Sequence, residues 1–262
     1  MSSLVVNRRT ALLFLGSDTG AILMSACGGN ASNTESSASP LASSSSASST
    51  SSSETPSSAS PSASPSRRNS FQRGFNVELN NADMEYTGEG YMYSTREKQG
   101  YGWPHPKRPQ EMSENSELGL YYSWAYASAG ISYAMKTGDD TYIKQSGMTE
   151  GDQKLFKSIA LLEETREGKY WEESGNFVYR LESDHPEKKG EEYSWPYQLQ
   201  MFHGDFYVRN GEVHEIPENT DGWGKIVYST GALKARYLDG AWQMEGFFEG
   251  IATNVVGKPF DK

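Results

Sequence analysis

Five polar side chains alternate along a predicted pair of strands and have types that could support acid–base chemistry or hold a metal: His203, Asp205, Tyr207, Arg209 and His214. Neighbours two residues apart on one strand face lie about 6–7 Å apart, close enough to share a substrate. One ion cannot bridge the two histidines, because His214 is expected opposite Tyr207 and thus roughly 13 Å from His203. We interpret the five as a solvated strand face, and we predict no metal or cofactor site.

The composition excludes several other functions. The chain carries a net charge of -10 without a basic stripe, so it is a poor partner for nucleic acid or for anionic lipid headgroups. Its sequence contains no Ser-His-Asp spacing, glycine-rich phosphate loop, HExxH or EF-hand pattern.

The chain's single cysteine, Cys27, follows Met24, Ser25 and Ala26. Small residues directly before a cysteine suit a signal peptidase with a narrow subsite, and the thiol can be acylated, for example with palmitate. This segment resembles the lipobox of bacterial lipoproteins, with methionine where leucine is usual. It predicts cleavage before Cys27 and a lipid anchor on that residue. A membrane-spanning helix is the alternative, but the apolar run is short and interrupted by Gly and Asp.

Arg8 and Arg9 form a short basic region ahead of this apolar run, so residues 1–26 are predicted to be a signal peptide. The two arginines also resemble a twin-arginine export signal, and export by that route or by the Sec route stays open. Either route predicts a protein on the extracytoplasmic face of the cell membrane, held there by the lipid on Cys27.

Residues 27–66 are predicted to be a disordered linker after the lipidated cysteine. About half of residues 31–66 are serine, and such a segment has too little apolar surface to offset the entropy of ordering. A flexible chain of this length spans roughly 30–35 Å on average. The linker would therefore hold the following domain away from the bilayer.

Residues 104–262 are predicted to form one α+β domain with helices packed on a curved antiparallel sheet. Helical periodicity covers 113–136, a helical turn is expected at 140–145, and a second long helix at 149–168 begins with a capping box of Thr149 and Asp152. Residues 67–103 are predicted to be an ordered extension that packs its tyrosines and tryptophans on the domain.

Two hairpins are predicted after the helices, at Asn210-Gly211 and Asp239-Gly240. The second pairs Tyr237 with Trp242 and places Lys234 opposite Glu245. One apolar face and opposite charges across the ladder are what a half-buried antiparallel pair needs.

Three segments carry a family resemblance: 104–120, with its proline-rich start and Glu-Asn-Ser-Glu; the aromatic 121–124; and 132–139, which ends in Thr-Gly-Asp. They resemble an uncharacterised family of actinobacterial lipoproteins, a domain of unknown function. Its helix-helix-sheet order is similar to the cone-shaped fold of nuclear transport factor 2 and ketosteroid isomerase. Family members often carry a cysteine pair soon after Thr-Gly-Asp, which is absent here. The resemblance implies no activity.

Together these features predict a non-enzymatic binding or accessory module of the cell envelope. Its partner would be a cell-wall glycan, a peptide or another envelope protein. The alternative is a small-molecule enzyme or carrier with a cone-shaped pocket between helices and sheet. A cavity there would favour the alternative, whereas an interior plugged by Tyr and Trp side chains would favour the binding module.

Overall fold

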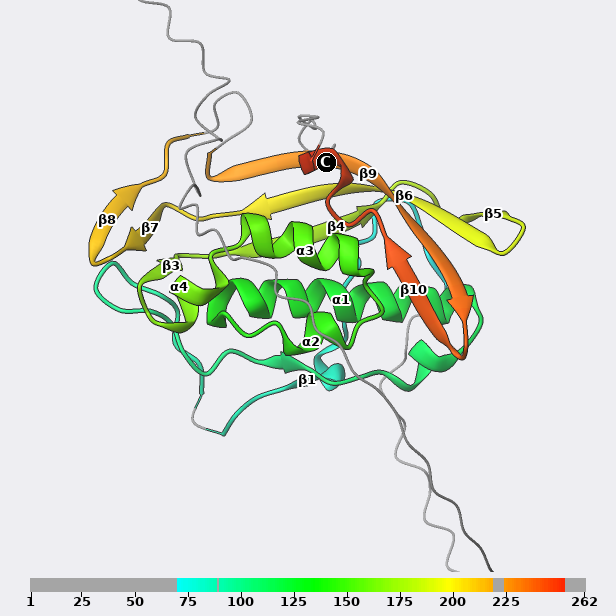
Figure 1. The fold of residues 1–262 in the computed structure, drawn as a ribbon, viewed down its shortest axis with the longest axis horizontal. Helices are drawn as coiled ribbons and strands as arrows, with labels where there is room; N and C mark the ends of the chain where they lie inside the picture. The colour runs from blue at the N-terminus through cyan, green and yellow to red at the C-terminus, as the bar shows by residue number, and fades with distance from the viewer. Residues whose placement is uncertain (1–69, 89, 219–223, 253–262) are drawn as a thin grey trace, which may run out of the picture. The chain divides into compact units, whose positions relative to one another are not determined.

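The computed structural model describes residues 70–88, 90–218 and 224–252 (Figure 1). The predicted signal peptide, Cys27 and the linker lie outside these residues. Within the described part, none of the helices combines the length and the apolar character needed to cross a membrane.

Helix α1, Glu117–Thr137, is the central element of the domain and is buried along most of its length. It begins four residues later than predicted, because the hydroxyl of Ser116 caps it by accepting a hydrogen bond from the backbone N–H of Gly119 (3.0 Å). A 3₁₀ turn, Gln110–Ser113, precedes it. Gly138 ends the helix in the left-handed conformation, with φ of 76°, as its position in the sequence predicts.

The helices after α1 are short. The predicted turn at 140–145 is α2, Thr141–Lys144. The single helix predicted for 149–168 is wrong, because the chain breaks at Ala160 into α3, Glu150–Ile159, and α4, Leu162–Arg166. Ala160 is extended there (φ -100°, ψ 128°), and Leu162 after the break is buried.

The predicted capping box at the start of α3 is also wrong. Thr149 makes no side-chain capping bond, although it occupies the N-cap position. Asp152 instead accepts hydrogen bonds from the backbone N–H groups of Gly246 (2.7 Å) and Phe247 (3.1 Å). A contact across more than ninety residues therefore replaces the local one, and it ties α3 to the bend after the last strand.

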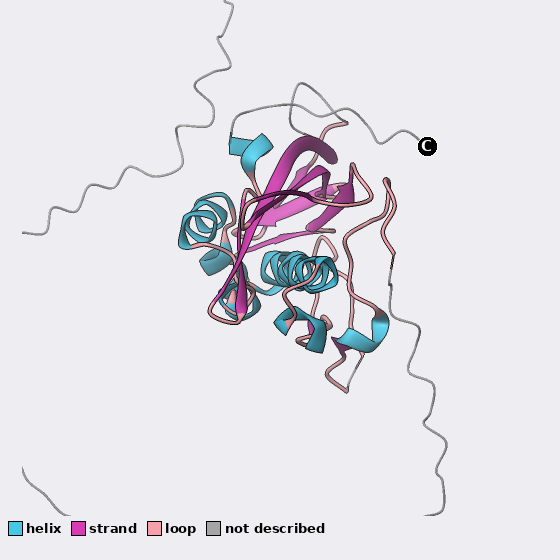
Figure 2. Ribbon diagram, turned by 90° about the vertical axis from the view of Figure 1, so that its right-hand side faces the viewer, coloured by secondary structure: helices cyan, strands magenta, loops and turns pink. Residues whose placement is uncertain are grey.

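The main sheet is antiparallel and curls over α1, which confirms the predicted α+β class (Figures 1 and 2). Four strands run in the order β10-β9-β6-β4. The short strand β5 pairs with the first three residues of β6. The strands are β4 Asn176–Leu181, β5 Glu187–Lys189, β6 Glu192–Phe202, β9 Ile226–Leu238 and β10 Ala241–Glu245. The β9–β10 hairpin has the predicted register: Tyr237 opposes Trp242, and Lys234 opposes Glu245.

A separate sheet in the order β3-β7-β8 holds the other predicted hairpin; its strands are β3 Tyr170–Glu172, β7 Phe206–Arg209 and β8 Glu212–Glu215. Asn210 and Gly211 both have positive φ, 53° and 82°, as a two-residue turn of this type requires. The chain leaves β6 through Gly204, whose φ is 86°, so β7 pairs with β3 rather than continuing the main sheet.

The predicted extension completes the core. Its backbone runs beside β4, where the N–H of Val77 donates to the carbonyl of Tyr179 (2.8 Å). Phe71 packs its ring on Tyr121 of α1 and on Trp195 of β6. Two further short strands, β1 Met84–Glu85 and β2 His105–Pro106, pair with each other. A 3₁₀ turn at Asn81–Asp83 precedes β1, and a short helix α5, Glu249–Ala252, follows β10.

Candidate functional site

The space between α1 and the main sheet, where a cone-shaped pocket would lie, is filled by aromatic side chains. Trp124 of α1 contacts the rings of Tyr179, Trp195 and Tyr197 at centroid distances of 5.6–6.1 Å, and all four side chains are completely buried. The hydroxyls of Tyr179 and Tyr197 donate to the backbone carbonyl of Phe247. The interior of the fold therefore leaves no room for a ligand at this position.

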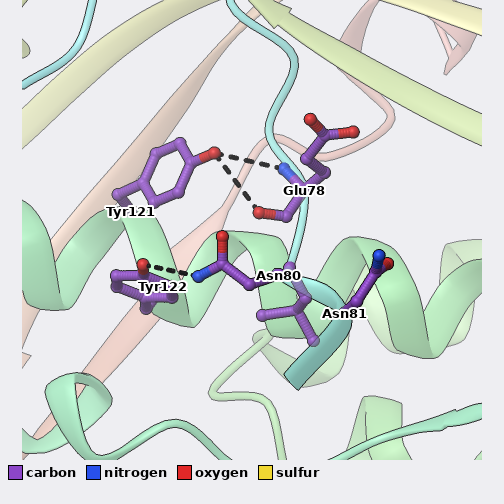
Figure 3. A pocket seen from close by; sticks show the side chains of 6 residues that line it. Glu78, Asn80, Asn81, Tyr121 and Tyr122 are labelled. Carbon is purple, nitrogen blue, oxygen red and sulfur yellow. Dashed lines mark hydrogen bonds between the residues drawn. The ribbon is translucent and has the colours of Figure 1, made fainter. Parts of the chain in front are cut away.

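Two cavities lie at the edge of this interior: one of about 280 Å³ between α1 and the extension, and one of about 220 Å³ between α1, the extension and Phe177 and Val178 of β4. Figure 3 shows the larger one, where the hydroxyl of Tyr121 points to the backbone of Glu78 and the amide of Asn80 points to Tyr122. Asn80 donates to the Tyr122 hydroxyl at 3.0 Å, and Tyr121 also donates to the carbonyl of Asn76. These polar groups bond to one another, so they hold the extension on α1.

The predicted polar face is not a uniform solvated surface, and for His203 that interpretation is wrong. His203 Nδ1 lies 3.1 Å from a carboxylate oxygen of Glu172, and only 19% and 9% of these side chains are exposed. The hydroxyl of Tyr170 donates to the other carboxylate oxygen. Burial lowers the pKa of His203, but the hydrogen bond to Glu172 outweighs it and leaves the pKa raised. The sequence could not show this pair, because β3 is brought to β7 by tertiary pairing.

The other four residues of that face have different partners. Tyr207 opposes His214 as predicted, and their rings stack at 4.7 Å. Asp205 lies 2.9 Å from the ammonium of Lys225, and Arg209 forms a two-bond ion pair with Glu164, whose shorter bond is 2.7 Å. The structure therefore does not bring the five residues into one reaction site.

No metal centre is formed by these residues. In the ranges that the structure describes, no three His, Cys, Asp or Glu side chains gather closely enough to hold an ion.

An exposed group of aromatic rings lies elsewhere, on the predicted extension; we call Tyr86, Tyr91, Tyr93 and Trp103 the tyrosine cluster. The three tyrosines are 43–64% exposed, whereas Trp103 beneath them is buried. Tyr91 stacks on Trp103 at 5.7 Å, and Tyr93 meets Trp103 edge to face at 5.5 Å. The expectation that this segment packs its aromatic side chains on the domain is thus correct for Trp103 and wrong for the tyrosines.

A tight hairpin holds the tyrosine cluster in place. Met92 and Tyr101 exchange backbone hydrogen bonds of 3.0 and 3.1 Å across it. At Gly100 a Cβ atom would lie 2.7 Å from the Trp103 ring, and at Gly102, where φ is 67°, it would collide with the carbonyl oxygen of Gly90. Glycine is therefore required at both positions for the chain to pass so close to the rings.

Side-chain contacts attach this hairpin to four elements of the domain. Gln99 donates to the carbonyls of Lys136 at the end of α1 and Thr165 at the end of α4. The indole N–H of Trp171 in β3 donates to the carbonyl of Thr95 (2.8 Å), and Arg96 forms an ion pair with Glu215 of β8 (3.0 Å). The hairpin is thus fixed to the domain along its length.

A partly buried lysine contacts the cluster through Trp103. Lys136 Nζ lies 4.6 Å from the centre of the Trp103 ring and donates to the side-chain oxygen of Asn176 at 2.6 Å. Burial lowers the pKa of Lys136 to about 8. Its contact with Trp103 is a cation–π interaction, which favours one position of the indole ring.

Fold and surface define a small α+β domain whose ordered extension exposes an aromatic surface. Residues 89–247 match the family of unknown function DUF6318, and the chain belongs to that family. No curated protein and no solved structure matches the chain. The predicted membership in a family of unknown function is thereby confirmed.

Proposed function

We propose that the protein is a lipid-anchored binding module of the cell envelope, and that the tyrosine cluster is its binding surface. The observation that carries this proposal is the contrast between the two aromatic groups. The rings between α1 and the sheet are fully buried and fill the interior, whereas Tyr91 and Tyr93 are exposed on a firmly held hairpin, with exposed Tyr86 beside them.

A group of tyrosine rings left exposed to water points to a surface that contacts another molecule. Clustered exposed aromatic side chains are a mark of interaction sites on soluble proteins. Tyrosine suits such sites because it offers a large rigid ring, a hydroxyl for hydrogen bonding and little conformational entropy to lose on binding. The hairpin contacts made by Gln99 and Trp171 reduce that entropy cost further.

The proposed cellular location rests on the N-terminal sequence. Lipidation at Cys27 would anchor the protein on the extracytoplasmic face of the membrane, as in the actinobacterial lipoproteins that the chain resembles. The serine-rich linker would let the domain reach polymers well above the bilayer. Because the interior is filled, the alternative of an enzyme or carrier with a cone-shaped pocket has less support.

The anchor is tested by fractionating cells that produce either the full chain or its Cys27→Ala variant. The full chain should sediment with membranes and be released by detergent, whereas the variant should not be retained. Unchanged membrane retention of Cys27→Ala would contradict the anchor.

The binding surface is tested with isolated, delipidated cell envelopes and the full chain carrying Cys27→Ala, which removes the lipid from the assay. Replacing Tyr91 and Tyr93 together by serine should weaken co-sedimentation by about tenfold or more, since two ring contacts are lost. Val213→Ser is the matched control, because Val213 is about as exposed as Tyr91 but lies on β8. Wild-type binding by the double variant would overturn the proposal.

A further inference from the structure

We infer that the tyrosine cluster binds an uncharged polysaccharide chain, whose sugar rings lie against the exposed faces of Tyr86, Tyr91 and Tyr93. This inference rests on the proposed function and names the chemistry of its ligand. It is carried by three features of the cluster: the arrangement of its rings, its hydroxyl groups and the charges around it.

The ring arrangement suits a chain of flat, C–H-rich units. Successive exposed rings are 6.4 Å apart from Tyr86 to Tyr91 and 5.2 Å apart from Tyr91 to Tyr93. Each aromatic face is electron-rich and attracts the weakly positive C–H groups that a pyranose ring presents on one side. Because Tyr91 and Tyr93 meet edge to face, they offer two differently oriented faces to neighbouring units of one chain.

The hydroxyl groups of the cluster suit a ligand rich in hydroxyls. The phenolic oxygens of Tyr91 and Tyr93 lie 3.2 Å apart and share a hydrogen bond. That bond raises the pKa of Tyr91 above its ordinary value. With one O–H shared between them, the pair still offers one O–H donor and acceptor lone pairs on both oxygens, which matches sugar hydroxyls better than the purely accepting carbonyls or purely donating amides of a peptide.

The charges around the cluster favour an uncharged ligand. The ammonium of Lys98 lies 4.9 Å from the ring of Tyr101, beside the cluster, and that of Lys136 lies behind Trp103. Both would repel a cationic peptide. The net charge of -10 would in turn repel an anionic polymer over longer distances. A neutral polysaccharide experiences neither repulsion, and its binding should change little with salt.

The ligand class is tested with soluble N-acetylglucosamine hexamer and a neutral glucan hexamer as probes. The full chain with Cys27→Ala is titrated by calorimetry and by competition against envelope co-sedimentation. At least one hexamer should bind and displace the envelopes. Tyr91→Ser with Tyr93→Ser should weaken that binding by about tenfold or more. Val213→Ser should leave it unchanged, as should raising the salt from 50 to about 500 mM.

The failures of the two proposals are distinguishable. If the tyrosine variants lose envelope binding but neither hexamer binds or competes, the polysaccharide inference is overturned while the binding surface stands. Strong weakening of envelope binding by salt would equally contradict an uncharged ligand. If envelope binding ignores the tyrosine variants, the binding surface itself is wrong, and the inference falls with it.

Discussion

Nδ1 of His203, the residue after β6, lies 3.1 Å from the carboxylate of Glu172 at the end of β3, and both side chains are largely shielded from water. The carboxylate also accepts the hydroxyl of Tyr170. A histidine held in this way is oriented through one ring nitrogen and carries more charge in the folded state than in the unfolded one.

This pair makes the stability of the domain depend on pH. The folded-state pKa of His203 is raised above its usual value near 6.5, so the stabilisation is complete below that value and is lost as the pH rises through the folded pKa. The melting temperature should therefore be higher at pH 6 than at pH 8, and His203→Gln should flatten this dependence. His214→Gln is the control, since its nearest carboxylate, Glu212, is 4.0 Å away and highly exposed. An unchanged pH profile in His203→Gln would contradict the pairing.

Asp140 gives the stability of the domain a pH dependence of the opposite sign. Burial alone would raise the pKa of Asp140, but hydrogen bonds from Lys144 (2.7 Å) and Lys157 (3.0 Å) lower it overall. Its stabilisation is therefore present above the unfolded pKa near 3.9 and is lost as the pH falls through the lower folded pKa. Asp140→Asn should reduce the free energy of unfolding at pH 7, and the difference from the wild type should shrink towards pH 3. Urea titrations at both pH values measure this, and an equal loss at pH 3 would argue against the ion pairs.

The filled interior makes a prediction about core stability. Trp124→Ala would leave a void among Tyr179, Trp195 and Tyr197, and should cost about 3–5 kcal/mol of unfolding free energy. Tyr93→Ala, which removes an exposed ring, should change it by less than about 0.5 kcal/mol. Chemical denaturation distinguishes the two, and a small loss for Trp124→Ala would mean that the interior is not tightly packed.

The tyrosine cluster depends on glycine at position 102. Gly102→Ala meets both an unfavourable φ of 67° and the carbonyl oxygen of Gly90, so it should cost about 2 kcal/mol or more and displace the rings. Gly190→Ala is a matched control, because Gly190 has nearly the same φ, 66°, with open space around it. Only the Gly102 variant should also lose envelope binding. Equal effects of the two substitutions would show that the close approach is unimportant.

Local sequence predicted the hairpins best. Asn210-Gly211 and Asp239-Gly240 each specify a turn, and alternation of apolar residues then specifies the register, so Tyr237 opposes Trp242 as expected. The extents of α3 and α4 were not predictable in this way. No Gly or Pro marks the break at Ala160, and Asp152 is engaged by backbone groups of a distant bend.

The sequence showed only that aromatic residues are frequent in the segment that forms the tyrosine cluster. Tyr91-Met92-Tyr93 and Gly100-Tyr101-Gly102-Trp103 indicate an ordered extension that packs its aromatic rings, but not which of those rings face water. That depends on Lys136 and Gln99, which join the hairpin to the end of α1. Likewise, the partner of His203 became evident only when β3 was placed beside β7.

Footprinting tests the binding surface most directly, because it locates the contact on the wild-type cluster. The full chain with Cys27→Ala would be exposed to hydroxyl radicals with and without isolated envelopes, and the modification of each tyrosine measured by mass spectrometry. Our account predicts that envelopes strongly protect Tyr86, Tyr91 and Tyr93 from modification. The modification of Tyr207, on β7, should not change. Protection centred on Tyr207 and His214, or bound protein with no protection of the cluster, would contradict it.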